Sequence, residues 1–463
     1  MTALERPLQI SGVFPSLAQI GDFGPPRSEI GIGALMPWNG SLYVQNYNSH
    51  KNDGAGVSLR RVHRDFSMDV VAETLGVDGT YTNRFIHYET SRLVIGPHVI
   101  APDHSIQTVA ELAPHRLCGT ARHLTKPTTH VYVLTMEGEV FELDLLTLDC
   151  TLVWDLNDEL GTEGELKVHY KDCYTAFGRF VVCSNEYGED DWAGRQARGR
   201  LAEFDGERWT ILARMPFTAI SGRADFGGTI FASGWDRSSA ILEVFTEADQ
   251  KWTRYRLPKA SHTFDHKWQT EWPRIREVEH ERFLMDHHGM FYELSPWAYG
   301  GRIWGVRPVS THLWVLGDFC SWQGLLVTGS DNASPSAGQN VTTAEPQSGM
   351  WFGKTDDLWG FGKPSGWGGP WWETEVAANE PSDPYLMTGF DQKCLHVENL
   401  GGIDVTVTIE IDFHGHGRFA TSTRLEVAAG ETITHVFPSG FSAHWVRLVS
   451  DGETTLSGQF VYT

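Results

Sequence analysis

Apolar and polar residues alternate along most of the chain in short runs, with the period of two that is typical of β-strands. His130–Met136 and Glu139–Leu145 are two such runs, separated by a tight turn. Similar runs recur in groups of four from Ile32 to Phe361, at intervals of very roughly 50 residues. Helical periodicity is rare, and Asp155–Glu165 is the best candidate for a helix. The pattern therefore predicts an all-β protein.

Repeated four-stranded units at this spacing indicate the blades of a β-propeller. The same short strands could also build two or more β-sandwiches. The count of about seven units and the lack of long linkers favour the propeller. We predict a seven-bladed β-propeller in residues 1–375, which would carry the functional face, and a small antiparallel β-sandwich in residues 380–463.

The composition changes after Gly362, where residues 362–384 are rich in Gly, Pro and Trp. We expect this segment to be a linker, a loop that caps one face of the propeller, or both. The C-terminal unit is expected to pack against the propeller, and a carbohydrate-binding role for it is the less favoured alternative.

The net charge of the 463-residue chain is −22 at pH 7, and its pI is about 5.3. An acidic surface repels phosphates, so we expect no nucleic-acid partner, although a local basic pocket could still bind an anionic substrate. No stretch approaches the eighteen or so apolar residues of a membrane span. The N-terminal residues lack the pattern of a secretory signal, and the six cysteines show no metal-ligand spacing. We therefore expect a cytoplasmic protein with reduced thiols, whose oligomeric state stays open.

Candidate chemistry concentrates in Pro258–Leu294, which holds five histidines and several acidic residues. Its first half reads as a polar, aromatic loop and its second half as short strands. Loops on a rigid scaffold commonly carry binding residues. The alternative is a hydrogen-bonded network of His, Asp and Trp that only fixes the loop.

In a propeller, the loops before each innermost strand and those between the second and third strands emerge on the same face. Those loops hold most of the reactive side chains of this chain. The candidates for proton transfer are His123, His266, His287, Tyr81 and Tyr187. The candidates for substrate binding are Arg84, Arg223, Arg274, Trp235, Trp268 and His262.

These residue types suit an acidic saccharide. Guanidinium groups make paired contacts with carboxylates, aromatic faces stack on sugar rings, and histidine exchanges protons near neutral pH. For each type a structural role is the alternative, because arginines at blade ends pair with acidic neighbours and tryptophans seal propeller cores.

The chain resembles the propeller-fold carbohydrate-active enzymes, in particular ulvan lyases and rhamnose–glucuronate lyases. The resemblance covers the expected propeller and rests on the blade pattern and the short segments IHY, GPH, ARHL, SGR and FDHKW. It implies β-elimination on an oligosaccharide that contains uronic acid. An arginine would clamp the carboxylate while His or Tyr acts as base and acid. The missing signal peptide is a departure that would fit an enzyme for imported oligosaccharides.

Three other functions stay open. A glycoside hydrolase needs two carboxylates, which Asp236, Asp265, Glu271 and Asp286 could supply. A non-catalytic propeller that serves as an interaction module is the second alternative. A metal-dependent lactonase or phytase would need a more acidic centre. We expect no required cofactor, although a divalent cation such as Ca or Zn is possible near Asp286, His287 and His288.

Overall fold

The structure is a computed structural model. It describes residues 29–48, 59–77, 79–161, 167–187, 198–223, 227–261, 273–295, 303, 305–312, 316–333 and 349–463.

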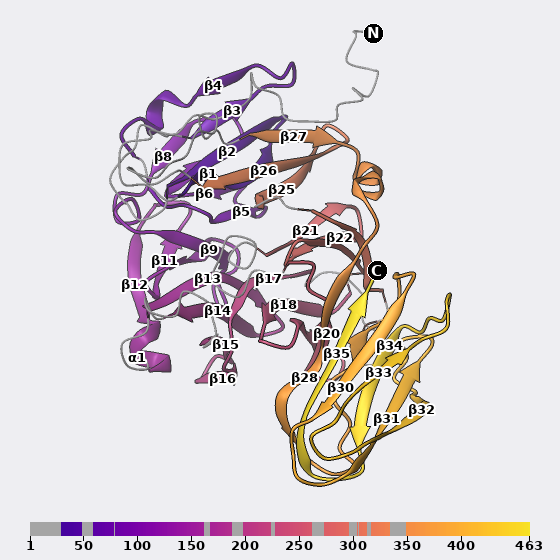
Figure 1. Ribbon diagram of the computed structural model, residues 1–463. Helices are drawn as coiled ribbons and strands as arrows, with labels where there is room; N and C mark the ends of the chain where they lie inside the picture. Colours follow the sequence, from indigo (N-terminus) through magenta and orange to yellow (C-terminus); the bar gives the residue numbers. More distant parts are fainter. Residues whose placement is uncertain are drawn as a thin grey trace, which may run out of the picture.

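Successive groups of four strands form antiparallel sheets, the blades (Figure 1). The first blade contains β1 (Glu29–Trp38), β2 (Ser41–Asn48), β3 (Arg60–Val62) and β4 (Met68–Val70). The second contains β5 (Arg84–His87), β6 (Arg92–Ile95), β7 (His98–Ile100) and β8 (Ile106–Thr108). The third contains β9 (Leu117–Arg122), β10 (His130–Thr135), β11 (Glu139–Asp144) and β12 (Cys150–Asp155).

The next three blades repeat this order. The fourth contains β13 (Lys167–Ala176), β14 (Arg179–Tyr187), β15 (Arg198–Phe204) and β16 (Trp209–Ala213). The fifth contains β17 (Phe217–Arg223), β18 (Thr229–Trp235), β19 (Ala240–Thr246) and β20 (Lys251–Leu257). The sixth contains β21 (Arg274–Glu279), β22 (Arg282–His287), β23 (Met290–Leu294) and β24 (Arg307–Thr311).

In the described residues, β25 (Leu316–Trp322), β26 (Leu325–Ala333) and β27 (Met350–Gly353) form the last sheet of the propeller. A 3₁₀ helix, η5 (Thr355–Phe361), follows it. The innermost strands β1, β5, β9, β13, β17, β21 and β25 each contact the next, and β25 contacts β1, so they close a ring. Hydrogen bonds complete the closure, because Glu29–Gly31 of β1 pair with Asp331–Ala333 of β26. The prediction of an all-β propeller is confirmed.

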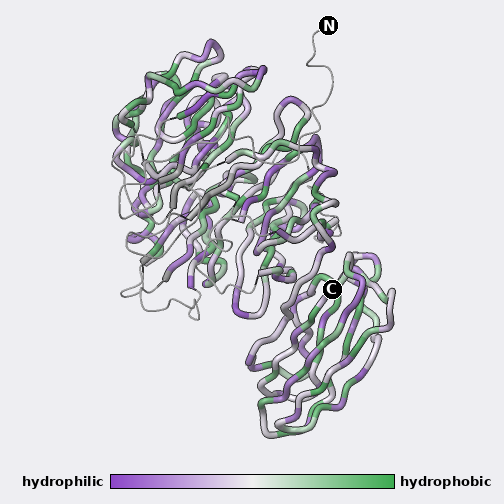
Figure 2. The backbone as a smooth tube through the Cα atoms, turned by 45° about the horizontal axis from the view of Figure 1, so that its top comes forward, coloured by the Kyte–Doolittle hydropathy of each residue, from purple (hydrophilic) through white to green (hydrophobic). Residues whose placement is uncertain are grey.

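The burial of the strands explains their sequences. Strands in the middle of a blade, such as β18 and β19, are buried along their whole length between neighbouring blades and are almost continuously apolar. Outermost strands such as β12 are more exposed. Figure 2 shows the resulting alternation of hydrophobic and hydrophilic stretches along the chain.

Tight hairpin turns connect several strands. The pairs Asn39-Gly40, Phe177-Gly178, His288-Gly289 and Gln323-Gly324 each have two consecutive residues with positive φ. Two such residues make a type I′ turn, whose twist matches the twist of antiparallel strands. The short helix expected within Asp155–Glu165 is present as α1 (Leu156–Leu160), and Asp155 caps it by accepting the Asn157 N–H.

The C-terminal residues form two facing sheets (Figure 1). One contains β29 (Tyr385–Leu386), β34 (Trp445–Ser450), β31 (Val405–Asp412) and β32 (Ala420–Val427). The other contains β28 (Gly366–Val376), β35 (Thr454–Tyr462), β30 (Lys393–Asn399) and β33 (Thr432–Val436). The segment expected to be a linker or capping loop thus supplies β28, which pairs with β35. The domain boundary near residues 375–380 stays a prediction.

The sandwich packs against the fifth blade. Arg256 of β20 pairs in parallel with Tyr385 of β29, and a single buried apolar cluster extends from blades five and six into the sandwich. Arg256 also bonds Asp236 of the blade at 2.7 Å and Asp383, just before β29, at 2.9 Å. The two units therefore share a core and an ion-pair network.

Candidate functional site

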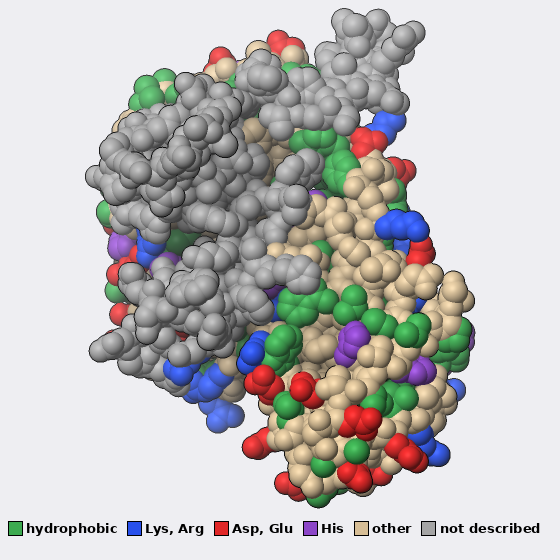
Figure 3. All heavy atoms as spheres, in the orientation of Figure 1, with side chains coloured by type: hydrophobic (Ala, Val, Ile, Leu, Met, Phe, Trp, Pro, Cys, Tyr) green, Lys and Arg blue, Asp and Glu red, His purple; other side chains and the backbone are tan. Residues whose placement is uncertain are grey.

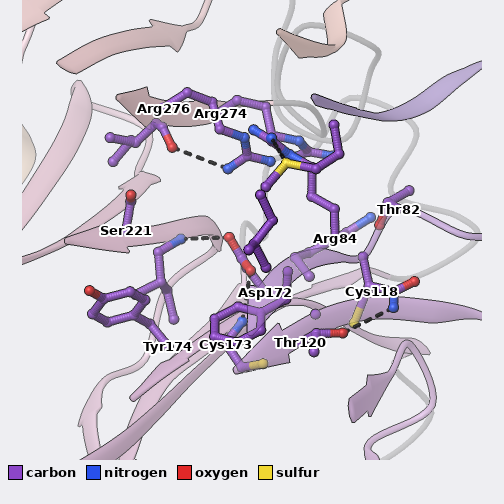
Figure 4. A pocket seen from close by; sticks show the side chains of 18 of the residues that line it. Thr82, Arg84, Cys118, Thr120, Asp172, Cys173, Tyr174, Ser221, Arg274 and Arg276 are labelled. Carbon is purple, nitrogen blue, oxygen red and sulfur yellow. Dashed lines mark hydrogen bonds between the residues drawn. The ribbon is translucent and has the colours of Figure 1, made fainter. Parts of the chain in front are cut away.

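The central channel of the propeller contains a pocket of about 360 Å³ (Figure 4). Its walls come from the innermost strands β1, β5, β9, β13, β17 and β21. Met36, Tyr174 and Ser221 lie in the second halves of β1, β13 and β17, and Tyr88 follows β5. Thr82 and Asn83 precede β5 and Arg274 begins β21, so the pocket extends along these strands toward both of their ends.

Three arginines dominate one wall of the pocket. Arg84 and Arg276 both pair with Asp318 of β25, at 2.7 Å from Nε to Oδ2 and 2.8 Å from Nε to Oδ1. Arg274 Nε donates to Gly317 O at 3.0 Å on the same strand. Backbone and carboxylate contacts thus fix the Nε side of each guanidinium group against β25. In Figure 4 the three groups gather on one side of the pocket.

Asp318 is fully buried and ionised. Burial by itself raises its pKa, but Arg276, Arg84 and the Leu35 N–H, which donates to Oδ2 at 2.8 Å, hold the pKa below its usual value. Burial lowers the pKa of Arg84 to about 10, against the opposite effect of Asp318. Both groups remain charged at neutral pH.

Two aspartates occupy equivalent places in the fold. Asp172 in β13 and Asp318 in β25 each follow a bulged residue, Lys171 and Gly317 respectively. Each accepts a backbone N–H from the next blade, because Asp172 Oδ2 bonds Ile220 N at 3.0 Å as Asp318 bonds Leu35 N. Both aspartates therefore join neighbouring blades.

The pocket is cationic although the chain is acidic. Arg84, Arg274, Arg276 and Lys171 line it, and the carboxylates that oppose them are Asp172 and Asp318. At the rim, Arg223 and Glu277 neutralise each other through a 2.8 Å ion pair. Asp and Glu side chains are spread over the face of the sandwich shown in Figure 3. A local excess of positive charge inside an acidic protein marks a place for an anionic group.

Two thiols, Cys118 and Cys173, also line the pocket. Burial raises the pKa of both well above its ordinary value. The nucleophile of cysteine chemistry is the thiolate, so these side chains act as small apolar groups here.

The structure brings two of the sequence candidates together and separates others. Arg84 and Arg274 line the pocket, whereas Arg223 lies at its rim against Glu277. Tyr81 is buried, and its hydroxyl donates to Ala113 O at 2.6 Å. Trp235 is also buried, with its ring edge against His288. Neither Tyr81 nor Trp235 lines the pocket.

The two described histidine candidates lie away from the pocket. His123 is buried and bonds Glu142 at 2.6 Å. Burial lowers its pKa, against the effect of Glu142. His287 is fully buried and bonds Gly234 O at 2.7 Å, and burial lowers its pKa to about 4. A neutral, enclosed imidazole is poorly placed to exchange protons with a ligand in the channel.

The remaining candidates cannot be placed. His262, His266 and Trp268 lie outside the described residues, and so does the side chain of Tyr187. The same holds for Asp265 and Glu271, two carboxylates of the hydrolase alternative. The other two are engaged elsewhere, Asp236 with Arg256 and Asp286 with His312 at 2.9 Å.

Sequence reasoning missed Lys171, Asp172, Arg276 and Asp318. One signal was available: Arg274 and Arg276 are two residues apart in a strand, so both point to the same face. The bulge that turns Lys171 and Asp172 toward the channel cannot be recognised from the pattern of hydrophobic and polar residues.

No group of three or more His, Cys, Asp or Glu side chains in the described part of the chain is placed to hold a metal ion. The expectation that no cofactor is required stays a prediction. No helix in the described ranges is both long and apolar enough to cross a membrane.

No protein-family model and no curated protein matches the chain. Among solved structures it is similar to the β-propeller domain of Cps50 (Swd1) from Myceliophteria thermophila, with 10% identity and a TM-score of 0.42 over 74% of this chain and 99% of that one. It is also similar to U3-55K, with 9% identity and a TM-score of 0.41 over 74% of this chain and 100% of that one. The Dos1 propeller has 9% identity and a TM-score of 0.39 over 73% of this chain and 96% of that one. With identities this low and TM-scores below 0.5, these likenesses transfer no function.

The expectation of a uronate lyase is wrong. Tyr81, His123 and His287, which were expected to act as acid and base, are enclosed by protein and do not line the pocket.

Proposed function

We propose that the chain is a non-catalytic propeller interaction module that binds a carboxylate-bearing partner in its central pocket. The observation that carries this proposal is the charge of the pocket, where Arg84, Arg274, Arg276 and Lys171 exceed the carboxylates of Asp172 and Asp318, while Glu277 is paired with Arg223. The partner's anionic group compensates the remaining positive charge.

The rigidity of the wall supports binding. Arg84 and Arg276 are held by Asp318, and Arg274 by the carbonyl of Gly317, so the cations are positioned before a partner arrives. Pre-organised charges lose little conformational freedom on binding, and guanidinium groups suit planar carboxylates. A contact between a carboxylate and such a cation contributes about 1.5–3 kcal/mol.

The module is proposed as non-catalytic because the pocket offers no poised proton-transfer pair among the described residues. The groups that line it are permanently charged cations, hydroxyls, high-pKa thiols, Asp172, and Glu277, which is paired with Arg223. Such a set holds an anion in place more readily than it moves protons.

The test is a calorimetric titration of the purified chain with succinate, malate and aspartate at low salt and pH 8. Lys171→Gln removes one cation of the pocket, which is expected to weaken binding by about ten- to a hundredfold. Lys363→Gln is the matched control, since Lys363 lies on the surface in an ion pair with Asp391. It should bind as the parent does.

Two results would contradict the proposal. One is that none of the three acids binds the parent chain at millimolar concentration. The other is that Lys171→Gln and Lys363→Gln bind equally. Chemical conversion of a probe during the titration, read by NMR of the recovered acid, would overturn the non-catalytic part.

A further inference from the structure

Asp172 faces the arginine wall across the pocket (Figure 4). It lies in β13, directly after the bulge at Lys171, and it lines the pocket together with Glu277, which is paired with Arg223. Asp318, its equivalent in β25, is fully buried and holds Arg84 and Arg276. The two aspartates join blades in the same way but differ in what their carboxylates contact.

The hydrogen bonds of Asp172 leave capacity on its carboxylate. Oδ1 accepts the Cys173 N–H at 2.9 Å and Oδ2 accepts the Ile220 N–H at 3.0 Å. A carboxylate offers about four acceptor positions, so each oxygen can accept one more donor. Cys173 and Ile220 both belong to the pocket lining, which places the carboxylate at the pocket wall.

This arrangement discriminates among anions. An anion held by the arginines lies close to a second negative charge, and like charges a few ångströms apart in a protein repel strongly. A hydroxyl or ammonium group on the same ligand reverses the effect, because it donates to Asp172 while the ligand's carboxylate contacts the arginines.

We infer that Asp172 is a specificity-determining residue, and that the ligand is a carboxylate with a hydrogen-bond donor, hydroxyl or ammonium, beside it. This inference rests on the proposed function, since it names the ligand class of the same pocket. Plain polyanions such as sulfate are disfavoured, because they bring charge without the donor.

Succinate, malate and aspartate form a matched series that tests this. All three have two carboxylates on four carbons, and they differ by hydrogen, hydroxyl or ammonium at one carbon. In the parent chain at pH 8, malate and aspartate are expected to bind at least about tenfold tighter than succinate, a difference of about 1.4 kcal/mol. Aspartate should bind tighter than malate if the natural donor is an ammonium group, and the reverse order points to a hydroxyl.

Asp172→Asn removes the negative charge with little change in shape, and should abolish this ranking mainly by tightening succinate. If the melting curve shows that the variant does not fold, the order in which the parent chain binds the three acids is sufficient to test the inference. The inference would be refuted if succinate bound as tightly as malate, or if sulfate did. Either result would leave the proposed function standing. If none of the acids binds, both fall.

Discussion

A single buried side chain, Asp318, organises the cationic wall. It contacts Arg84 and Arg276 and also accepts the Leu35 N–H from the first blade. Removing one partner from a buried charge network leaves the others uncompensated, which typically costs about 3–5 kcal/mol. Asp318→Asn is therefore expected to lower the free energy of unfolding by about that amount in urea titrations.

Asp391→Asn provides the comparison, because Asp391 pairs with Lys363 on the surface, where ion pairs contribute little to stability. Equal effects of the two substitutions would show that Asp318 does not hold the blades together.

At the scale of elements, bulges in the innermost strands bring neighbouring blades into close contact. Gly317 is the bulged residue of β25, and a Cβ placed there would lie 1.7 Å from Ile32 O in β1. A backbone carbonyl cannot move aside cheaply, so Gly317→Ala is expected to destabilise the protein by at least about 2 kcal/mol. Thermal unfolding measures the effect.

Gly360 in η5 is the control, since a Cβ there meets no atom within 4 Å. Gly360→Ala should change stability by no more than about 1 kcal/mol. A Gly317→Ala variant as stable as Gly360→Ala would mean that β25 and β1 can separate without penalty.

Much of the fold could be predicted from the hydrophobic pattern, because the same succession of strand environments recurs from blade to blade. The pairs His130–Met136 and Glu139–Leu145 correspond to β10 and β11. The Gly- and Pro-rich Gly366–Val376 escaped this reasoning, since β28 owes its conformation to pairing with β35, far away in sequence.

The site was less predictable for a similar reason. The position of the Arg276 side chain depends on its bond with Asp318, 42 residues away in sequence. The position of Asp172 depends on a bulge in β13. Arginines on a strand can be recognised in a sequence, but their acidic partners come close to them only when the ring of blades closes. The histidines led to wrong site candidates, because buried histidines such as His287 make hydrogen bonds within the fold.

For the whole molecule, buried histidines set the response to acid. Burial lowers the pKa of His98, His287 and His444 to about 4, and these residues lie in the second blade, the sixth blade and the sandwich. Unfolding returns each to its ordinary pKa near 6.5, so the unfolded chain binds more protons between pH 6.5 and 4. Stability should therefore fall through this window, by up to about 3 kcal/mol per histidine at pH 4.

Urea titrations at pH 7 and 4.5 measure this loss. His287→Asn should reduce the difference in stability between the two pH values, because it removes one of the buried histidines. The control is His280→Gln, because His280 lies exposed in a turn and its replacement should leave the difference unchanged. A pH-independent stability of the parent chain would contradict the explanation.

The hydrogen-bonded join between β1 and β26 has a consequence for biosynthesis. β1 leaves the ribosome about 300 residues before β26, which corresponds to roughly 15–60 s of translation at typical rates. During that time the edge of β1 that will face the last blade has no partner, and open strand edges invite pairing with other chains. The nascent propeller is thus an unclosed arc for most of its synthesis, and a ribosome that stalls before Leu325 holds a chain whose ring cannot close.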